Sequence, residues 1–339
     1  MRVRATVKPT IRARRVASRA LCPGLLAFII DAVCNAEIPM PVSIHQVLSR
    51  HARPLAGAAS LALLAACALA PHASSPRLAL VIGNADYENA PALHSPANDA
   101  ADMCAALKRD GFRTTCLTNL ASRADFDAQV RAYVDQLTPD TVGVVFYSGH
   151  GLQAGGANFL IPTLAQPKTV AEDPLRVLYS LDDLFDRLRQ KPARFQLVIL
   201  DACRTELLVQ PPRAVGPVAV KPAPRSTLVR ALDGVPKVGS GLAPIQDAPP
   251  GAMVLYATAS RESAYDGRGR NSPLTHQVLA HIETRDLPVR DFIERVTQGV
   301  EAETRRDYGK AMTPFVYGSF GGKFCFAGCP DAPVLTPMQ

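Results

Sequence analysis

Short apolar runs that suit buried β-strands alternate along this chain with segments of helical periodicity, and this alternation is the strongest constraint on the fold. The apolar runs cover residues 77–83, 112–117, 141–147, 195–200 and 253–257. The helical patterns cover residues 97–110, 123–136, 181–189, 273–281 and 289–303. Parallel strands covered by helices on both faces appear as continuous apolar runs. The sequence therefore predicts an α/β fold with a mostly parallel central sheet flanked by helices on both faces.

The ends of the first helical pattern carry recognisable signals. Asn98 or Asp99 near its start is a candidate N-cap, and Gly111 follows its last turn. With 47% hydrophobic residues and a mean hydropathy of +0.05, the chain has a globular composition. We expect one large domain over residues 76–330, followed by a C-terminal tail at 331–339.

The first 75 residues differ in charge from the rest of the chain. They hold nine lysine and arginine residues and two acidic residues, which accounts for the whole formal net charge of +7. The remaining residues carry equal numbers of basic and acidic side chains. A neutral body gives no support for a nucleic-acid partner, which the overall charge alone would suggest.

An apolar run at residues 55–70 follows Arg50 and Arg53 and has the character of a secretory signal, with Met40 placed where such a signal begins. The run is short for a membrane span, and a buried helix of the fold is the alternative interpretation. The sequence LAAC resembles a bacterial lipobox with Cys67 as a lipid anchor, whereas ALA at 68–70 offers ordinary cleavage. We expect an exported protein, either periplasmic or a membrane-anchored lipoprotein, and both forms stay open.

Five of the eight cysteines lie beyond the leader. In an oxidising compartment, spacing favours the disulfides Cys104–Cys116 and Cys325–Cys329, which would leave Cys203 as the unpaired thiol. The alternative is that Cys104 and Cys116 are simply buried apolar residues.

Two predicted strands run directly into residues that carry chemistry. The strand at 141–147 continues into YSGHG with His150, and the strand at 195–200 continues into DACR with Cys203. Ligands of parallel α/β sheets bind beyond the carboxyl ends of the strands, so both segments face one crevice. A thiolate is a nucleophile, and an imidazole beside it can protonate a leaving amine. We predict His150 and Cys203 as the catalytic pair.

The glycines beside His150 also have expected roles. Without side chains they let the backbone approach a substrate closely. We assign the oxyanion site to the backbone N–H groups of Gly151 and Cys203, where negative charge would develop.

YSGHG followed by DACR closely resembles the caspase-like peptidases, especially bacterial proteins of metacaspase type. The segments ALVIGN, LHSPANDA, YATAS and RNSPLT extend the resemblance over about residues 76–326. The spacing from His150 to Cys203 also fits, since a caspase-type His lies about 50 residues before its Cys. The resemblance implies a cysteine endopeptidase of the caspase-hemoglobinase fold, acting through a thioester acyl-enzyme.

The resemblance also implies a substrate class. True caspases carry Gln before A-C-R, where this chain has Asp201. The metacaspase positions that match Asp99, Ser148 and Asp201 line an acidic pocket, which implies a polypeptide substrate with Arg or Lys before the scissile bond. Carboxylates bind a guanidinium through paired, charge-assisted hydrogen bonds. Pro96 stands where metacaspases often have Cys, and the alternative roles are a helix cap for Asp99 and a structural acceptor for Asp201.

Residues 209–251 are rich in proline and glycine and predict a mobile surface loop. Its basic residues Arg225, Arg230 and Lys237 are candidate self-cleavage sites, and a passive linker is the alternative. No acidic loop has the ligand spacing of a calcium site. We expect no metal site and no required cofactor, and calcium activation stays open, as does the oligomeric state.

Two other functions remain as alternatives. The fold could serve as a catalytically idle binding domain, because many folds host unrelated functions. The same His and Cys pair could also belong to another cysteine acyl-transfer enzyme.

Overall fold

The computed structural model describes residues 75–203, 226–235, 238–239, 242–243, 245, 248–259 and 264–329. The predicted start at Met40, the lipobox at Cys67 and the tail at 331–339 lie outside the described residues. Among the helices of the described residues, none is both long enough and apolar enough to cross a bilayer.

The main sheet has the strand order β2-β1-β3-β6-β8-β9. All neighbouring strands pair in parallel except the last two, β8 and β9, which are antiparallel. The strands are β1 (Arg77–Gly83), β2 (Arg113–Thr118), β3 (Val142–Ala154), β6 (Phe195–Cys203), β8 (Ala252–Tyr256) and β9 (Phe315–Gly318). The predicted mostly parallel sheet is confirmed.

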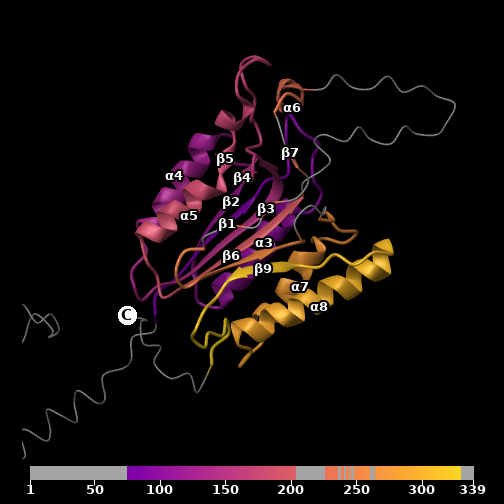
Figure 1. Ribbon diagram of the computed structural model, residues 1–339. Coiled ribbons are helices and arrows are strands. Elements are labelled where there is room, and N and C mark those ends of the chain that lie inside the picture. The colour runs from indigo at the N-terminus through magenta and orange to yellow at the C-terminus, as the bar shows by residue number, and fades with distance from the viewer. Residues whose placement is uncertain are drawn as a thin grey trace, which may run out of the picture. The chain divides into compact units, whose positions relative to one another are not determined.

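Helices cover both faces of this sheet, as predicted (Figure 1). One face packs on α3 (Pro96–Arg109), α7 (Pro273–Ile282) and α8 (Val289–Tyr308). The other packs on α4 (Arg123–Val134) and α5 (Leu181–Gln190). Because successive strand residues point to opposite faces, Val144 and Phe146 join the first core while Val145 and Tyr147 join the second.

The prediction that Asn98 or Asp99 caps α3 is wrong. Ser95 is the N-cap, its side chain makes no capping hydrogen bond, and Pro96 occupies the first turn. Proline suits that position because its missing N–H would have no partner within the helix. The C-terminal signal is confirmed, since Gly111 follows the helix at a φ of 79°.

Strands β3 and β6 continue further than their apolar runs. β3 runs through the whole YSGHG motif to Ala154, and β6 ends at Cys203. His150 and Cys203 therefore lie within the sheet rather than in turns beyond it, which corrects the predicted strand ends. Pairing between the two strands continues to His150 of β3 and to Cys203, the last residue of β6, so the motif residues up to this point stay in the sheet.

The end of β3 also starts a small second sheet. A turn at Gly155 and Gly156 leads into β4 (Ala157–Leu160), which folds back antiparallel on β3. The other elements of this region are η1 (Pro174–Val177), β5 (Tyr179–Ser180) and β7 (Val238–Gly239). This layer extends the sheet beyond the proposed catalytic pair.

The prediction of a mobile loop at 209–251 is wrong for several residues in this range. Ser226 caps a helix, α6 (Thr227–Leu232), whose Leu228 and Leu232 are buried. Further along, Leu242 and Ile245 are also buried. The two leucines of α6 are four residues apart and share one helical face, a local signal that the proline content of the region obscured.

The candidate self-cleavage sites in this region fall in different places. Arg230 lies within α6, whereas Arg225 and Lys237 lie outside the described residues.

Both predicted disulfides are confirmed. Cys104 pairs with Cys116 and Cys325 pairs with Cys329, with Cα–Cα distances of 6.1 and 5.4 Å. The first bridge joins α3 to the edge strand β2.

Candidate active site

The main chains of the proposed catalytic residues lie side by side. His150 of β3 is the register partner of Cys203 of β6, and Ser148 is the partner of Asp201. Neighbouring strands are about 4.8 Å apart. The sheet therefore brings together two residues that lie far apart in the sequence.

The imidazole of His150 is buried and held in one orientation. Its Nε2 lies 2.8 Å from the carbonyl oxygen of Pro91. A carbonyl oxygen can only accept, so Nε2 carries a hydrogen, and in the neutral ring Nδ1 is the basic nitrogen. Burial lowers the pKa of His150, and the Pro91 carbonyl and the charge of Asp266 offset part of this effect.

Two tyrosines fix the main chain around His150. The His150 N–H donates to the hydroxyl of Tyr87 at 2.8 Å, and the hydroxyl of Tyr147 donates to the His150 carbonyl at 2.7 Å. The Tyr87 ring also packs on the imidazole, with 4.5 Å between centroids. The histidine is therefore supported on both its backbone and its ring.

Gly149 is required by these same contacts. A Cβ atom there would lie 2.6 Å from the Tyr147 hydroxyl and 2.7 Å from that of Tyr87. The sequence suggested that the glycines of this motif let a substrate approach the backbone. For Gly149 the structure gives another reason, which is room for the two hydroxyl groups. Gly151, the predicted oxyanion donor, continues β3 opposite Leu160 of β4.

The predicted acidic residues gather next to this pair. The Ser148 hydroxyl donates to Asp99 at 2.9 Å, and the Ser272 N–H donates to Asp99 at 3.1 Å. Asp201 accepts from the hydroxyls of Ser272 and, at 2.7 Å, Thr275. Residues from α3, β3, β6 and the start of α7 thus form one polar cluster inside the molecule.

Burial disfavours ionisation of both carboxylates, and a neighbouring acidic charge adds to this effect at each: Asp201 at Asp99, and Asp266 at Asp201. Burial, followed by the charge of Asp201, raises the pKa of Asp99 to about 8. Burial raises the pKa of Asp201 to about 6. Within the described residues, no lysine, arginine or histidine forms an ion pair with either carboxylate. A cation entering this cluster would therefore favour the charged forms of the carboxylates, with no fixed cation of the described residues competing for them.

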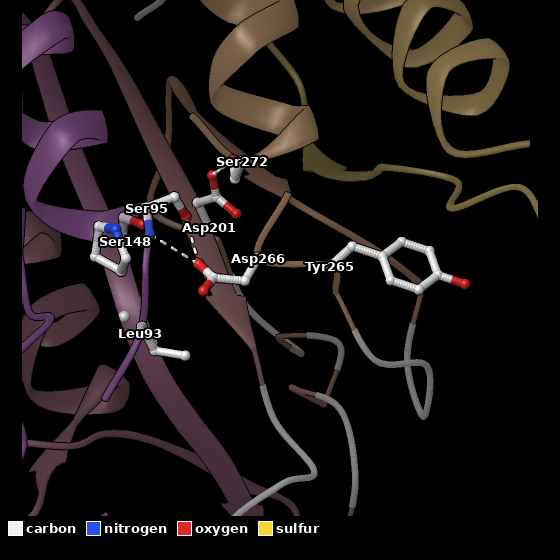
Figure 2. Close-up of a pocket in the computed structure, with 9 residues that line it drawn as sticks. Leu93, Ser95, Ser148, Asp201, Tyr265, Asp266 and Ser272 are labelled. Carbon is white, nitrogen blue, oxygen red and sulfur yellow. Dashed lines mark hydrogen bonds between the residues drawn. The ribbon is translucent and has the colours of Figure 1, made fainter. Parts of the chain in front are cut away.

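A narrow pocket opens over the cluster (Figure 2). Its lining residues are Leu93, Ser95, Pro96, Ser148, Gly149, Asp201, Tyr265, Asp266 and Ser272. Asp99 is not among them, because it lies fully buried behind Ser148. The expectation that Asp99 lines the pocket is therefore wrong, whereas Ser148 and Asp201 do line it and Asp99 lies behind Ser148.

Asp266 is a pocket residue that the sequence analysis missed. Its carboxylate accepts from the His94 N–H at 2.6 Å, the Ser95 N–H at 3.1 Å and the Ser95 hydroxyl at 2.5 Å. It therefore ties the pocket to the segment that also carries Pro91. The nearby RNSPLT segment belongs to the family resemblance and indicated that this region could contribute to the site. Asp266 itself follows no predicted strand and belongs to no recognisable motif, so no signal in the sequence identified it.

The sequence model of the caspase-domain family matches residues 76–324 of this chain. The chain belongs to the caspase-domain family. Membership supports a cysteine peptidase activity in general terms. In the part of the chain that the structure describes, no group of three or more potential ligand side chains is placed to hold a metal ion.

Individual proteins match this chain at low sequence identity. The human protein named mucosa-associated lymphoid tissue lymphoma translocation protein 1 is 26% identical over 132 residues, and its Mus musculus homolog is 27% identical over 128 residues. Each match covers 38% of this chain and 15% of the relative. The crystal structure of caspase-1 from Spodoptera frugiperda is 12% identical with a TM-score of 0.48, covering 77% of this chain and 93% of that one.

Proposed function

We propose that this caspase domain is a cysteine endopeptidase of metacaspase type that cleaves polypeptides after Arg or Lys. The observation that carries the proposal is the pair of buried carboxylates, Asp99 and Asp201, beside His150 and Cys203 and without a fixed cation among the described residues.

A basic side chain would relieve the electrostatic cost of this arrangement. A guanidinium or ammonium group in the pocket would favour the charged form of Asp201 and, from behind Ser148, that of Asp99. Asp266 adds a third acidic group at the wall. A planar guanidinium can bind a carboxylate through two hydrogen bonds, so we expect Arg to bind more tightly than Lys.

The proposed reaction uses His150 and Cys203 in turn. The Cys203 thiolate attacks the carbonyl carbon, and the N–H groups of Gly151 and Cys203 stabilise the oxyanion. Nδ1 first takes the proton of the Cys203 thiol, which generates the thiolate, because Nε2 already donates to Pro91. The resulting imidazolium then gives this proton from Nδ1 to the leaving amine as the C–N bond breaks. Water then attacks the thioester with Nδ1 as the base, which releases the acid product and regenerates the thiol.

A peptide library cut by the purified mature protein tests the substrate class. We expect cleavage after Arg and Lys, and no cleavage by the Cys203→Ala variant. His150→Ala should lose at least a thousandfold in kcat, because the residues of a catalytic pair act as a unit. Preferred cutting after Asp, or indifference to basic residues, would overturn the proposed specificity.

A peptidyl chloromethyl ketone that ends in Arg separates the alternatives. It should label Cys203 in the peptidase, located by mass spectrometry. An idle binding domain would not be labelled. A different acyl-transfer enzyme should show no preference for the Arg reagent over one ending in a neutral residue.

A further inference from the structure

The loop at residues 264–272 carries pocket groups at two places. Asp266 lies near its start, and Ser272 at its end caps α7 and donates to Asp201. Between them, Gly267 turns the chain at a φ of 96°, where a Cβ atom would lie 2.5 Å from the Asn271 carbonyl oxygen. The orientation of Asp266 therefore depends on how the first part of this loop is held.

The residues on either side of Asp266 contact one aromatic ring, that of Tyr308 at the end of α8. The Tyr265 ring stacks on it, with 3.9 Å between centroids and an interplanar angle of 1°. The Arg268 guanidinium carbon lies 4.9 Å from the centroid of the same ring. Stacked aromatic pairs and cation–π contacts both stabilise such an arrangement.

The two neighbouring side chains, Tyr265 and Asp266, face different ways. Figure 2 shows the Asp266 carboxylate turned toward Ser95, with the Tyr265 ring extending away from the pocket. Tyr265 also lines the pocket, and holding its ring against Tyr308 helps to fix the backbone that presents the Asp266 carboxylate toward Ser95.

We propose that Tyr308 is a positioning residue that sets the preference for a basic substrate residue, acting through Tyr265 and Arg268 on the pocket carboxylate Asp266. The inference rests on the proposed function. Tyr308 touches neither the substrate pocket nor His150 in this scheme, so its effect should appear in substrate binding rather than in the chemical step.

Peptides that differ only in the residue before the scissile bond test this inference. Arg is compared with citrulline, which has nearly the same shape but no charge. For Tyr308→Ala we expect a roughly five- to tenfold rise in KM for the Arg peptide, with kcat changed less than twofold. The KM for the citrulline peptide should hardly change, so discrimination between the peptides falls. Tyr308→Phe keeps the ring and should restore wild-type values.

Two controls connect the effect to the loop and to Asp266. Arg305→Ala changes an exposed residue one turn earlier on α8 and should leave both KM values unchanged. In an Asp266→Asn background, Tyr308→Ala should add little, because the group it positions has already lost its charge. Tyr308→Leu retains an apolar side chain without stacking and replaces the alanine variant if that one does not fold.

The outcomes separate this inference from the proposed function. A wild-type enzyme that does not discriminate Arg from citrulline overturns both. A discriminating wild type whose Tyr308→Ala and Tyr308→Leu variants, shown to be folded by thermal unfolding, keep the same discrimination overturns only the role of Tyr308. Additive effects of Tyr308→Ala and Asp266→Asn would also contradict it.

Discussion

Gly149 occupies a position where a side chain would collide with the two hydroxyl groups that hold His150. The nearest atoms to its missing Cβ are those of Tyr147 and Tyr87. Both tyrosines are buried within the structure, so neither can move away at low cost.

The Gly149→Ala variant should therefore be impaired in both activity and stability. We expect at least a tenfold loss in kcat/KM, because the clash shifts His150, and a loss of roughly 1–3 kcal/mol in the free energy of unfolding. Peptide kinetics and urea denaturation measure the two effects. Gly234→Ala is the control, because Gly234 has no positive φ and its Cβ would make only an ordinary contact, 3.5 Å from the Ala231 carbonyl oxygen. Wild-type kinetics for Gly149→Ala would show that the hydroxyl groups do not hold the histidine.

Asp99 makes stability depend on pH. Its pKa is raised to about 8 from the ordinary value of 3.8, so the folded protein binds a proton that the unfolded chain releases. The free energy of unfolding should fall as pH rises from about 4 to about 8. Asp99→Asn removes the contribution of Asp99, leaves that of Asp201 between about pH 4 and pH 6, and should be more stable than wild type at pH 8 by roughly 1–3 kcal/mol.

Urea denaturation at pH 5 and pH 8 measures this difference. The same variant should bind Arg peptides more weakly, because an amide behind Ser148 cannot ionise when a guanidinium enters the pocket. Asp102→Asn is the matched control on α3: the hydrogen bond from Arg270 lowers the pKa of Asp102, so its contribution has the opposite sign. An unchanged pH profile in Asp99→Asn would contradict the prediction.

At the scale of elements, the two disulfides differ in the length of chain that they close. Cys104 and Cys116 are 12 residues apart, whereas Cys325 and Cys329 are 4 residues apart. The first joins a helix to the edge of the sheet, and that helix carries Asp99 in its first turn.

Replacing each pair by serine should destabilise the protein unequally. Loop-closure entropy predicts a loss of about 3 kcal/mol for Cys104 and Cys116 and about 2 kcal/mol for Cys325 and Cys329. Chemical denaturation of the two double variants measures the difference. An equal or reversed order would mean that native-state contacts, rather than chain entropy, set the contribution of each bridge.

At the scale of the whole molecule, the leader and the disulfides favour the same compartment. We propose that the protein is exported, as a periplasmic protein or a lipoprotein anchored at Cys67, because disulfides persist in oxidising environments. Expression in a bacterium with labelled palmitate, followed by fractionation and thiol titration, tests this. We expect export and one free thiol, that of Cys203, in the mature domain. Cytoplasmic retention with reduced cysteines would contradict export, and an unlabelled exported product would exclude only the anchor.

Much of the fold and part of the site follow from local sequence. Apolar periodicity located β1, β8 and the helices α3, α4, α5, α7 and α8 within about five residues, but not α6. The YSGHG and DACR motifs selected His150 and Cys203 as the candidate pair. Spacing alone identified both disulfides, because the candidates were few. These signals are local, since each depends on residues that are close together along the chain.

Only the tertiary structure decided the groups whose partners lie far away in sequence. The extension of β3 and β6 depends on pairing between strands, and the packing of α6 depends on a core that its own residues do not reveal. Asp266 reaches the pocket through hydrogen bonds to residues more than 170 positions earlier. The basic nitrogen of His150 is set by Pro91, a contact that folding creates. Local periodicity cannot encode such contacts, because they arise only when distant segments are brought together.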